Sequence, residues 1–120
     1  MPKVNYLIAA CSHRTNRGPL GNIEGKDTLK LHLQELSKTR TEQLDQVTVL
    51  RALPLVRGDK ELAEEYWGIE HLFKDFKCPV VTLDVIDSYF SYSSWIQACQ
   101  KYRRDFDYYI LTEDDYYPSH

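Results

Sequence analysis

The chain has too few cysteines, in the wrong spacing, for a disulfide framework or a cysteine-based metal site. Cys11, Cys78 and Cys99 are odd in number and form no Cys-x-x-Cys pair. Each stands among apolar residues, which is typical of a reduced thiol in a protein core. The four histidines lack the His-Glu-x-x-His spacing of a zinc hydrolase, so no histidine metal site is predicted.

The chain also lacks an excess of one charge and a long apolar run. Its 15 basic and 18 acidic residues give a net charge of −3, which offers no footprint for nucleic acid or an anionic membrane. No apolar run approaches the ~20 residues that span a bilayer. Met1 to Asn5 lead into a strand pattern without a signal peptide, so we expect a cytoplasmic protein. With 42% hydrophobic residues in 120, residues 1–120 are predicted to form a single domain.

Short apolar runs alternate with stretches of helical periodicity along the chain. The runs predict four strands, at residues 4–11, 47–53, 79–85 and 107–112. Between the first two runs lies a segment rich in glycine and asparagine, residues 12–26, which predicts an exposed loop. Strands that alternate with helices favour an α/β fold with a mostly parallel, right-handed, Rossmann-like sheet.

Three helices are expected between these strands, each with a candidate cap and an apolar stripe. Asp27 or Thr28 can cap the first helix, Asp59 the second, and Ser93 or Ser94 the third. The stripes consist of Leu29, Leu33 and Leu36 in the first helix, Leu62, Tyr66, Ile69 and Phe73 in the second, and Trp95, Ile96, Cys99 and Tyr102 in the third.

Three consecutive acids end the last predicted strand. Tyr108 to Leu111 read as a strand buried inside a sheet, and Glu113, Asp114 and Asp115 follow directly. The carboxyl ends of strands are where an α/β sheet places its ligands. Because adjacent carboxylates repel one another, a divalent cation such as Mn²⁺ or Mg²⁺ would relieve them. A solvated acidic turn is the simpler alternative for these residues.

Two other polar clusters follow predicted strands and should share the same sheet edge. Ser12 to Arg17 follow the first strand, and Asp84 to Ser88 follow the third. Arg14 or Arg17 would face an anionic ligand, since a guanidinium pairs well with phosphate. Asp84 or Asp87 would accept hydrogen bonds from a ribose or a base. The alternatives are surface charges for the arginines and turn formers or helix caps for the aspartates.

The segment Phe106 to Pro118, an apolar strand followed by an acidic triplet, resembles the DxD-type motif of GT-A fold glycosyltransferases. The resemblance implies a nucleotide-sugar-binding half in which Asp115 ligates Mn²⁺ or Mg²⁺, with Glu113 or Asp114 assisting. It also implies that Glu113 faces the ribose or the donor sugar and that Asp114 lies at the nucleotide sugar. Glu113 stands where the family has its first aspartate. The opening strand, including Ala10, with Ser12 and Arg14, is similar to the family segment beside the nucleotide. The resemblance further implies a UDP-sugar donor, a hydroxyl acceptor, and a longer glycosyltransferase of which residues 1–120 form the N-terminal part.

Other functional classes remain open on the sequence. A non-catalytic nucleotide-sugar-binding module would carry the same residues. A P-loop hydrolase fits poorly, because Gly25-Lys26 would require a glycine at position 20 and a hydroxyl at position 27, where Leu20 and Asp27 stand. A receiver-like signalling module needs a lysine after a fifth strand, and no fifth strand is predicted. An incomplete sheet edge beyond the fourth strand would also allow a homo-oligomer.

Overall fold

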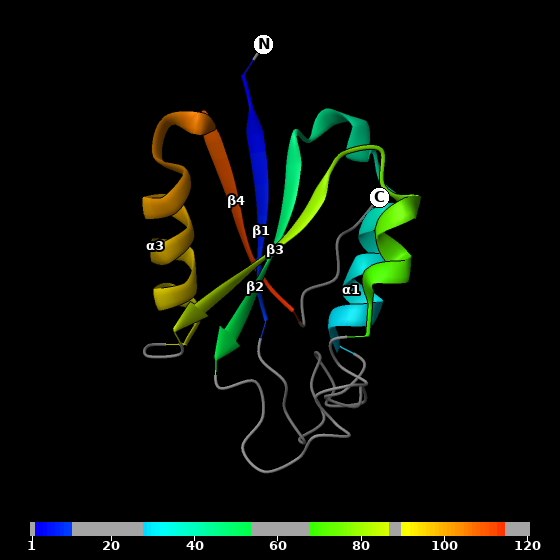
Figure 1. Ribbon diagram of the computed structural model, residues 1–120. Helices are drawn as coiled ribbons and strands as arrows, with labels where there is room; N and C mark the ends of the chain where they lie inside the picture. The colour runs from blue at the N-terminus through cyan, green and yellow to red at the C-terminus, as the bar shows by residue number, and fades with distance from the viewer. Residues whose placement is uncertain (1, 11–27, 54–67, 87–89, 115–120) are drawn as a thin grey trace.

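A four-stranded, all-parallel sheet forms the centre of the computed structural model, which describes residues 2–10, 28–53, 68–86 and 90–114. The strands lie in the order β3-β2-β1-β4 (Figure 1). Their bounds are Val4–Ala10 for β1, Gln46–Leu53 for β2, Val80–Ile86 for β3 and Tyr108–Glu113 for β4. The predicted α/β class is confirmed, and the strand ends within the described residues lie within one residue of their predicted positions.

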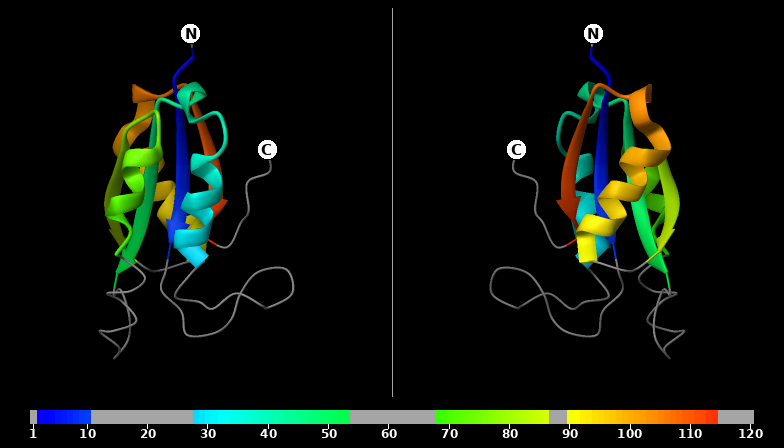
Figure 2. Two further views of the ribbon diagram at one scale, coloured as in Figure 1. Left: turned by 90° about the vertical axis from the view of Figure 1, so that its right-hand side faces the viewer. Right: turned by 90° about the vertical axis from the view of Figure 1, so that its left-hand side faces the viewer.

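Helical elements cover both faces of the sheet (Figures 1 and 2). Helix α1 (Thr28–Ser37) and the 3₁₀ helix η3 (Glu70–Asp75) lie on one face, and helix α3 (Phe90–Tyr102) lies on the other. Two shorter 3₁₀ turns, η2 (Thr41–Gln43) and η4 (Arg103–Asp105), precede β2 and β4. Since parallel crossovers are almost always right-handed, the chain changes face when it turns back from β3 toward β4.

Alternation along the central strands sends successive side chains into two separate cores. On the α1 face, Tyr6 and Ile8 of β1 and Val47 and Val49 of β2 pack against the leucine stripe of α1. On the α3 face the buried residues are Leu7, Leu50, Val85 and Ala98. Cys78 packs against the first core and Cys99 against the second, both as free, half-buried thiols. Their placement agrees with the predicted reduced core cysteines.

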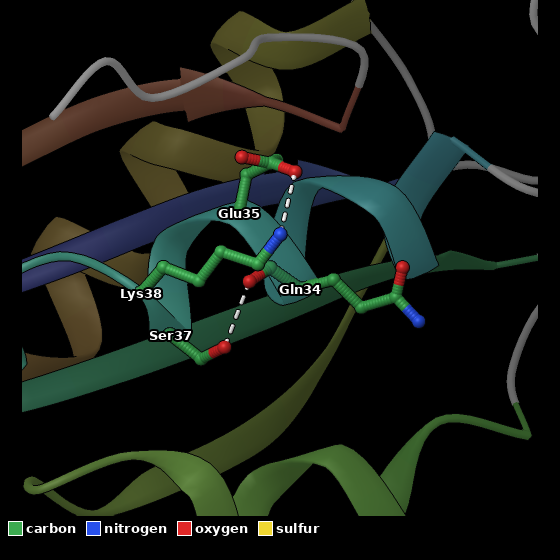
Figure 3. A network of polar contacts seen from close by, with 4 residues as sticks. All are labelled: Gln34, Glu35, Ser37 and Lys38. Atoms are coloured by element: carbon green, nitrogen blue, oxygen red, sulfur yellow. Dashed lines mark hydrogen bonds and ion pairs between the residues drawn. The ribbon is translucent and has the colours of Figure 1, made fainter.

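Helix α1 forms as predicted, with Leu29, Leu33 and Leu36 buried on one stripe. Local contacts end it (Figure 3). The hydroxyl of Ser37 donates to the Gln34 carbonyl at 2.8 Å, and Lys38 forms an ion pair with Glu35 at 3.2 Å. The last backbone carbonyls of a helix have no N–H partner within the helix. The Ser37 hydroxyl supplies a donor to one of them, and the Lys38–Glu35 ion pair lies at the same helix end.

Two helix predictions need correction. Helix α3 begins at Phe90, so Ser93 and Ser94 lie inside the helix instead of capping it, and Ile96 is 54% exposed instead of buried. A serine is a good cap, yet tertiary packing outweighs this local preference. Residues 59–67 of the second predicted helix lie outside the described residues. Gly68 and Ile69 are not helical, and Phe73 belongs to the short 3₁₀ helix η3.

The prediction that β4 lies inside the sheet is wrong for the described residues, where β4 is an edge strand beside β1. Tyr108 is 62% exposed, Ile110 41% and Leu111 45%. An apolar run looks the same in sequence whether one or two strands flank it, because the pairing partners lie far away along the chain. No helix within the described ranges is long and apolar enough to cross a membrane.

Candidate functional site at the carboxyl edge of the sheet

The strand order creates a topological switch point between β1 and β4. From β1 the chain builds outward through β2 to β3 and then returns to the other side of β1 to add β4. Helix α1, which follows β1, lies on one face of the sheet, and helix α3, which precedes β4, lies on the other. A reversal of strand order of this kind is the position where α/β sheets bind ligands. Ala10, at the end of β1, and Glu113 and Asp114, at the end of β4, occupy this position.

Asp114 is buried at this switch point and turned toward α1. It is only 2% exposed, and its backbone N–H donates to the Ala9 carbonyl at 3.0 Å. One carboxylate oxygen accepts from the hydroxyl of Thr28 at 3.4 Å. Thr28 is the first residue of α1, whose own first turn contains no acid. A carboxylate at a helix N-terminus is stabilised by the helix dipole. Asp114, which directly follows β4, therefore places a negative charge at the start of α1, whose own first turn has none.

Glu113 lies on the opposite side of β4 from Asp114, because successive strand residues point to opposite faces. Its neighbour across the ladder is Ala9, and its side chain is half-buried on the α3 face. The strand end is fixed on this face by Trp95, whose indole N–H donates to the Thr112 carbonyl at 3.0 Å. Glu113 and Asp114 therefore do not converge on one point in this structure.

Asp84 lies at the far side of the sheet and already has a partner. It pairs in register with Arg51 of β2, and the Arg51 Nε donates to its carboxylate at 2.6 Å. This hydrogen bond raises the pKa of Arg51 above its usual value. Strands β2 and β1 separate β3 from β4. At ~4.8 Å per strand, Asp84 lies on the order of 14 Å from the β4 end, so only an extended ligand would contact both.

A buried tyrosine-histidine pair underlies the switch point. The Tyr6 hydroxyl lies 3.0 Å from His32 Nε2, and the two rings meet edge-on between β1 and α1. Burial raises the pKa of Tyr6, while a hydrogen bond with Thr112 works in the opposite direction. The Thr112 hydroxyl donates to the Leu7 carbonyl at 2.8 Å. These polar contacts join β1, α1 and β4 directly beneath the candidate site.

The predicted site residues divide into three groups. Ala10, Glu113 and Asp114 lie together at the switch point, and Asp84 lies apart from them at β3. Ser12, Arg14, Arg17, Asp87 and Asp115 lie outside the described residues. Sequence reasoning missed the roles of Arg51 and Trp95, which fix Asp84 and the end of β4. A lone arginine within an apolar strand could have indicated that Arg51 has an acidic partner. Nothing in the local sequence indicates the contact of Trp95 with the Thr112 carbonyl.

The carboxylates fit a divalent cation by their chemistry, since Mg²⁺ and Mn²⁺ prefer oxygen ligands. Within the described ranges, no group of three or more histidine, cysteine, aspartate or glutamate side chains is placed to hold a metal ion. Of the two described acids at the end of β4, Asp114 is buried and bonded to Thr28, whereas Glu113 is half-buried.

Comparison with protein-family models, curated proteins and solved structures gives no significant match to this chain.

Proposed function

We propose that this chain binds a nucleotide-diphosphate sugar and belongs to a metal-dependent glycosyltransferase of the GT-A type, as its donor-binding half. The observation that carries the proposal is the acidic end of β4 at the switch point beside β1. The proposed ligand would lie across the carboxyl ends of β4 and β1. Asp84, held by Arg51, would be reached only by its far end.

The chain's own residues would bind and orient the donor. Glu113 and Asp115 would hold Mn²⁺ or Mg²⁺, while Asp114 keeps the strand end against α1. When bound, the ion supplies charge neutralisation of the diphosphate and stabilises it as a leaving group. Arg14 would add a guanidinium to the same diphosphate, and Ala10 and Ser12 would lie along the nucleotide.

Nucleotide titration with and without Mn²⁺ tests the proposal. We expect UDP to bind in the presence of Mn²⁺, with weaker binding of GDP, ATP and GTP, measured by isothermal titration calorimetry. Asp115→Asn and Glu113→Gln should each weaken Mn²⁺-dependent UDP binding by at least about tenfold, which corresponds to ~1.4 kcal/mol.

Lys74→Gln provides the matched control, because this exposed side chain lies on η3 away from the carboxylates. UDP affinity that is indifferent to Mn²⁺, or unchanged in Asp115→Asn, would contradict the assignment. Mn²⁺-dependent binding without sugar transfer or donor hydrolysis would favour a non-catalytic nucleotide-sugar-binding module.

A further inference from the structure

Trp95 ties helix α3 to the last residues of β4. Its indole N–H donates to the Thr112 carbonyl at 3.0 Å, and this carbonyl belongs to the peptide group that links Thr112 to Glu113. Helix α3 follows β3, so its first turns lie at the carboxyl edge of the sheet (Figure 1). The contact therefore fixes the peptide group directly before the Glu113 side chain.

The indole is itself held by two sets of contacts. Trp95 packs against the core of the α3 face, which consists of Leu7, Leu50, Val85 and Ala98. The Tyr92 ring meets the indole edge-on, with ring centroids 5.8 Å apart. A side chain restrained in this way offers its N–H donor at a fixed place, so it is suited to orient a neighbouring group.

The end of β4 has few restraints of its own, because within the described residues β4 is an edge strand with one neighbour. Its ladder with β1 supports one side, while several of its apolar side chains are exposed. On the α1 face, Thr28 bonds to Asp114 at 3.4 Å, and on the α3 face Trp95 bonds to Thr112. Two helices thus hold the end of β4 from opposite faces of the sheet.

We infer that Trp95 is a positioning residue for Glu113 in the proposed metal and nucleotide-sugar site. This inference rests on the proposed function, in which Glu113 and Asp115 hold Mn²⁺ or Mg²⁺. Trp95 acts through the Thr112 carbonyl. A side chain binds a cation more tightly when neighbouring hydrogen bonds fix its orientation, because less freedom is lost on binding. Loss of the indole donor should therefore weaken cation-dependent binding and leave the fold intact.

The chain offers a matched control at the other end of β4. The Tyr109 hydroxyl donates to the Arg103 carbonyl at 2.9 Å, so it too bonds a side chain to a backbone carbonyl, between β4 and the turn after α3. At ~3.3 Å per residue, the Cα atoms of Tyr109 and Glu113 lie about 13 Å apart. Tyr109→Phe and Trp95→Phe each remove one such donor and keep an aromatic ring. Of the two, only Trp95 bonds to the peptide group next to Glu113.

Isothermal titration calorimetry of the full chain with UDP and Mn²⁺ tests the inference. We expect Trp95→Phe to weaken Mn²⁺-dependent UDP binding about tenfold, which is the lower end of the effect of removing an outer hydrogen bond of a metal site. Tyr109→Phe should keep the wild-type affinity within about twofold. Both variants should keep the wild-type circular dichroism spectrum, and both should lower the melting temperature by a few degrees.

A second measurement uses the unmodified chain. If the Trp95 contact favours ligand binding, the bound ligand favours the contact by the same factor. UDP with Mg²⁺ should therefore slow hydrogen exchange of the Trp95 indole N–H by up to about tenfold, followed by NMR. The backbone N–H of Tyr108, which donates to the Lys3 carbonyl at the other end of β4, should slow less.

Equal UDP affinities in Trp95→Phe and Tyr109→Phe would overturn the inference and leave the proposed function standing. The same holds if ligand binding slows exchange of the Tyr108 N–H as much as that of the indole. A wild-type chain that binds no UDP in the presence of Mn²⁺ would refute the proposed function and the role of Trp95 together.

Discussion

At the scale of single residues, the hydroxyl of Tyr6 makes a buried polar contact on the α1 face of the sheet. It lies 3.0 Å from His32 Nε2, and both side chains are buried. Tyr6→Phe keeps the ring and removes this contact, so a buried histidine nitrogen loses a hydrogen-bond partner. We expect a loss of about 1–3 kcal/mol in the free energy of unfolding, measured by urea denaturation.

Tyr92→Phe is the matched control for this substitution. Tyr92 is 72% exposed, so loss of its hydroxyl should change the free energy of unfolding by less than about 0.5 kcal/mol. Equal effects of the two substitutions would mean that the Tyr6–His32 contact adds nothing to stability.

The same hydroxyl predicts a dependence of stability on alkaline pH. Burial raises the pKa of Tyr6 in the folded chain, whereas the unfolded chain keeps the ordinary value of about 10. The unfolded state therefore loses the proton first as pH rises. The stabilisation is fully present below about pH 10 and is lost as pH climbs through the folded-state pKa.

The free energy of unfolding, measured from pH 8 to 11, should thus fall more steeply in the wild type than in Tyr6→Phe. Burial also raises the pKa of Cys78 and Cys99, which adds to the slope in both proteins and cancels in the comparison. Parallel slopes would contradict the assignment to Tyr6.

At the scale of elements, the end of β4 is tied to the start of α1 by Asp114. Its carboxylate is buried beside Thr28, where the N-terminal end of α1 favours negative charge. Asp114→Asn removes that charge, and we expect a loss of about 1–2 kcal/mol in the free energy of unfolding. A double-mutant cycle with Thr28→Ala should show a coupling of about 0.5 kcal/mol or more.

Asp105→Asn, on the exposed η4 turn, serves as the control and should be nearly neutral. A coupling energy of zero would show that the two residues are adjacent without interacting.

Elements with strong local patterns were predictable from the sequence. The leucine stripe predicts α1, and the apolar runs predict all four strands. The predicted start of α3 is wrong because serine is a good helix cap in isolation, and Ser93 and Ser94 were therefore placed at the cap. In the structure α3 begins at Phe90, and Ala98 and Trp95 pack it on the sheet. Cross-strand partners such as Arg51 and Asp84 depend on register, which no local pattern contains.

At the scale of the whole molecule, the sequence predicted that the candidate site residues share the carboxyl edge of the sheet. It did not predict how far apart they lie along that edge. Parallel strands place Ala10, Asp84 and Glu113 at one edge, as expected. The strand order then separates Asp84 from Glu113 by two strands, and this order depends on long-range pairing. The metal and nucleotide-sugar site at that edge stays a prediction.

Ligand binding would appear as a change in the stability of the whole chain. If UDP with Mn²⁺ binds the folded state alone, a ligand concentration of 100 times the dissociation constant stabilises it by about 2.7 kcal/mol. We therefore expect the melting temperature to rise with UDP and Mn²⁺ together, followed by differential scanning fluorimetry. Neither component alone should reproduce the rise, and Asp115→Asn should lose it. A shift produced by Mn²⁺ alone would point to a cation site without a nucleotide.

The placement of β1 between β2 and β4 also has a kinetic consequence. The backbone N–H of Lys3, just before β1, donates to Asp107, just before β4, across 104 positions of the chain. During synthesis, β1 and β2 can meet early, yet the second side of β1 waits until β4 has left the ribosome. Contacts of such high sequence separation slow folding. Until β4 arrives, the most buried strand of the finished sheet is itself an open edge, and the nascent chain is at that stage most exposed to aggregation.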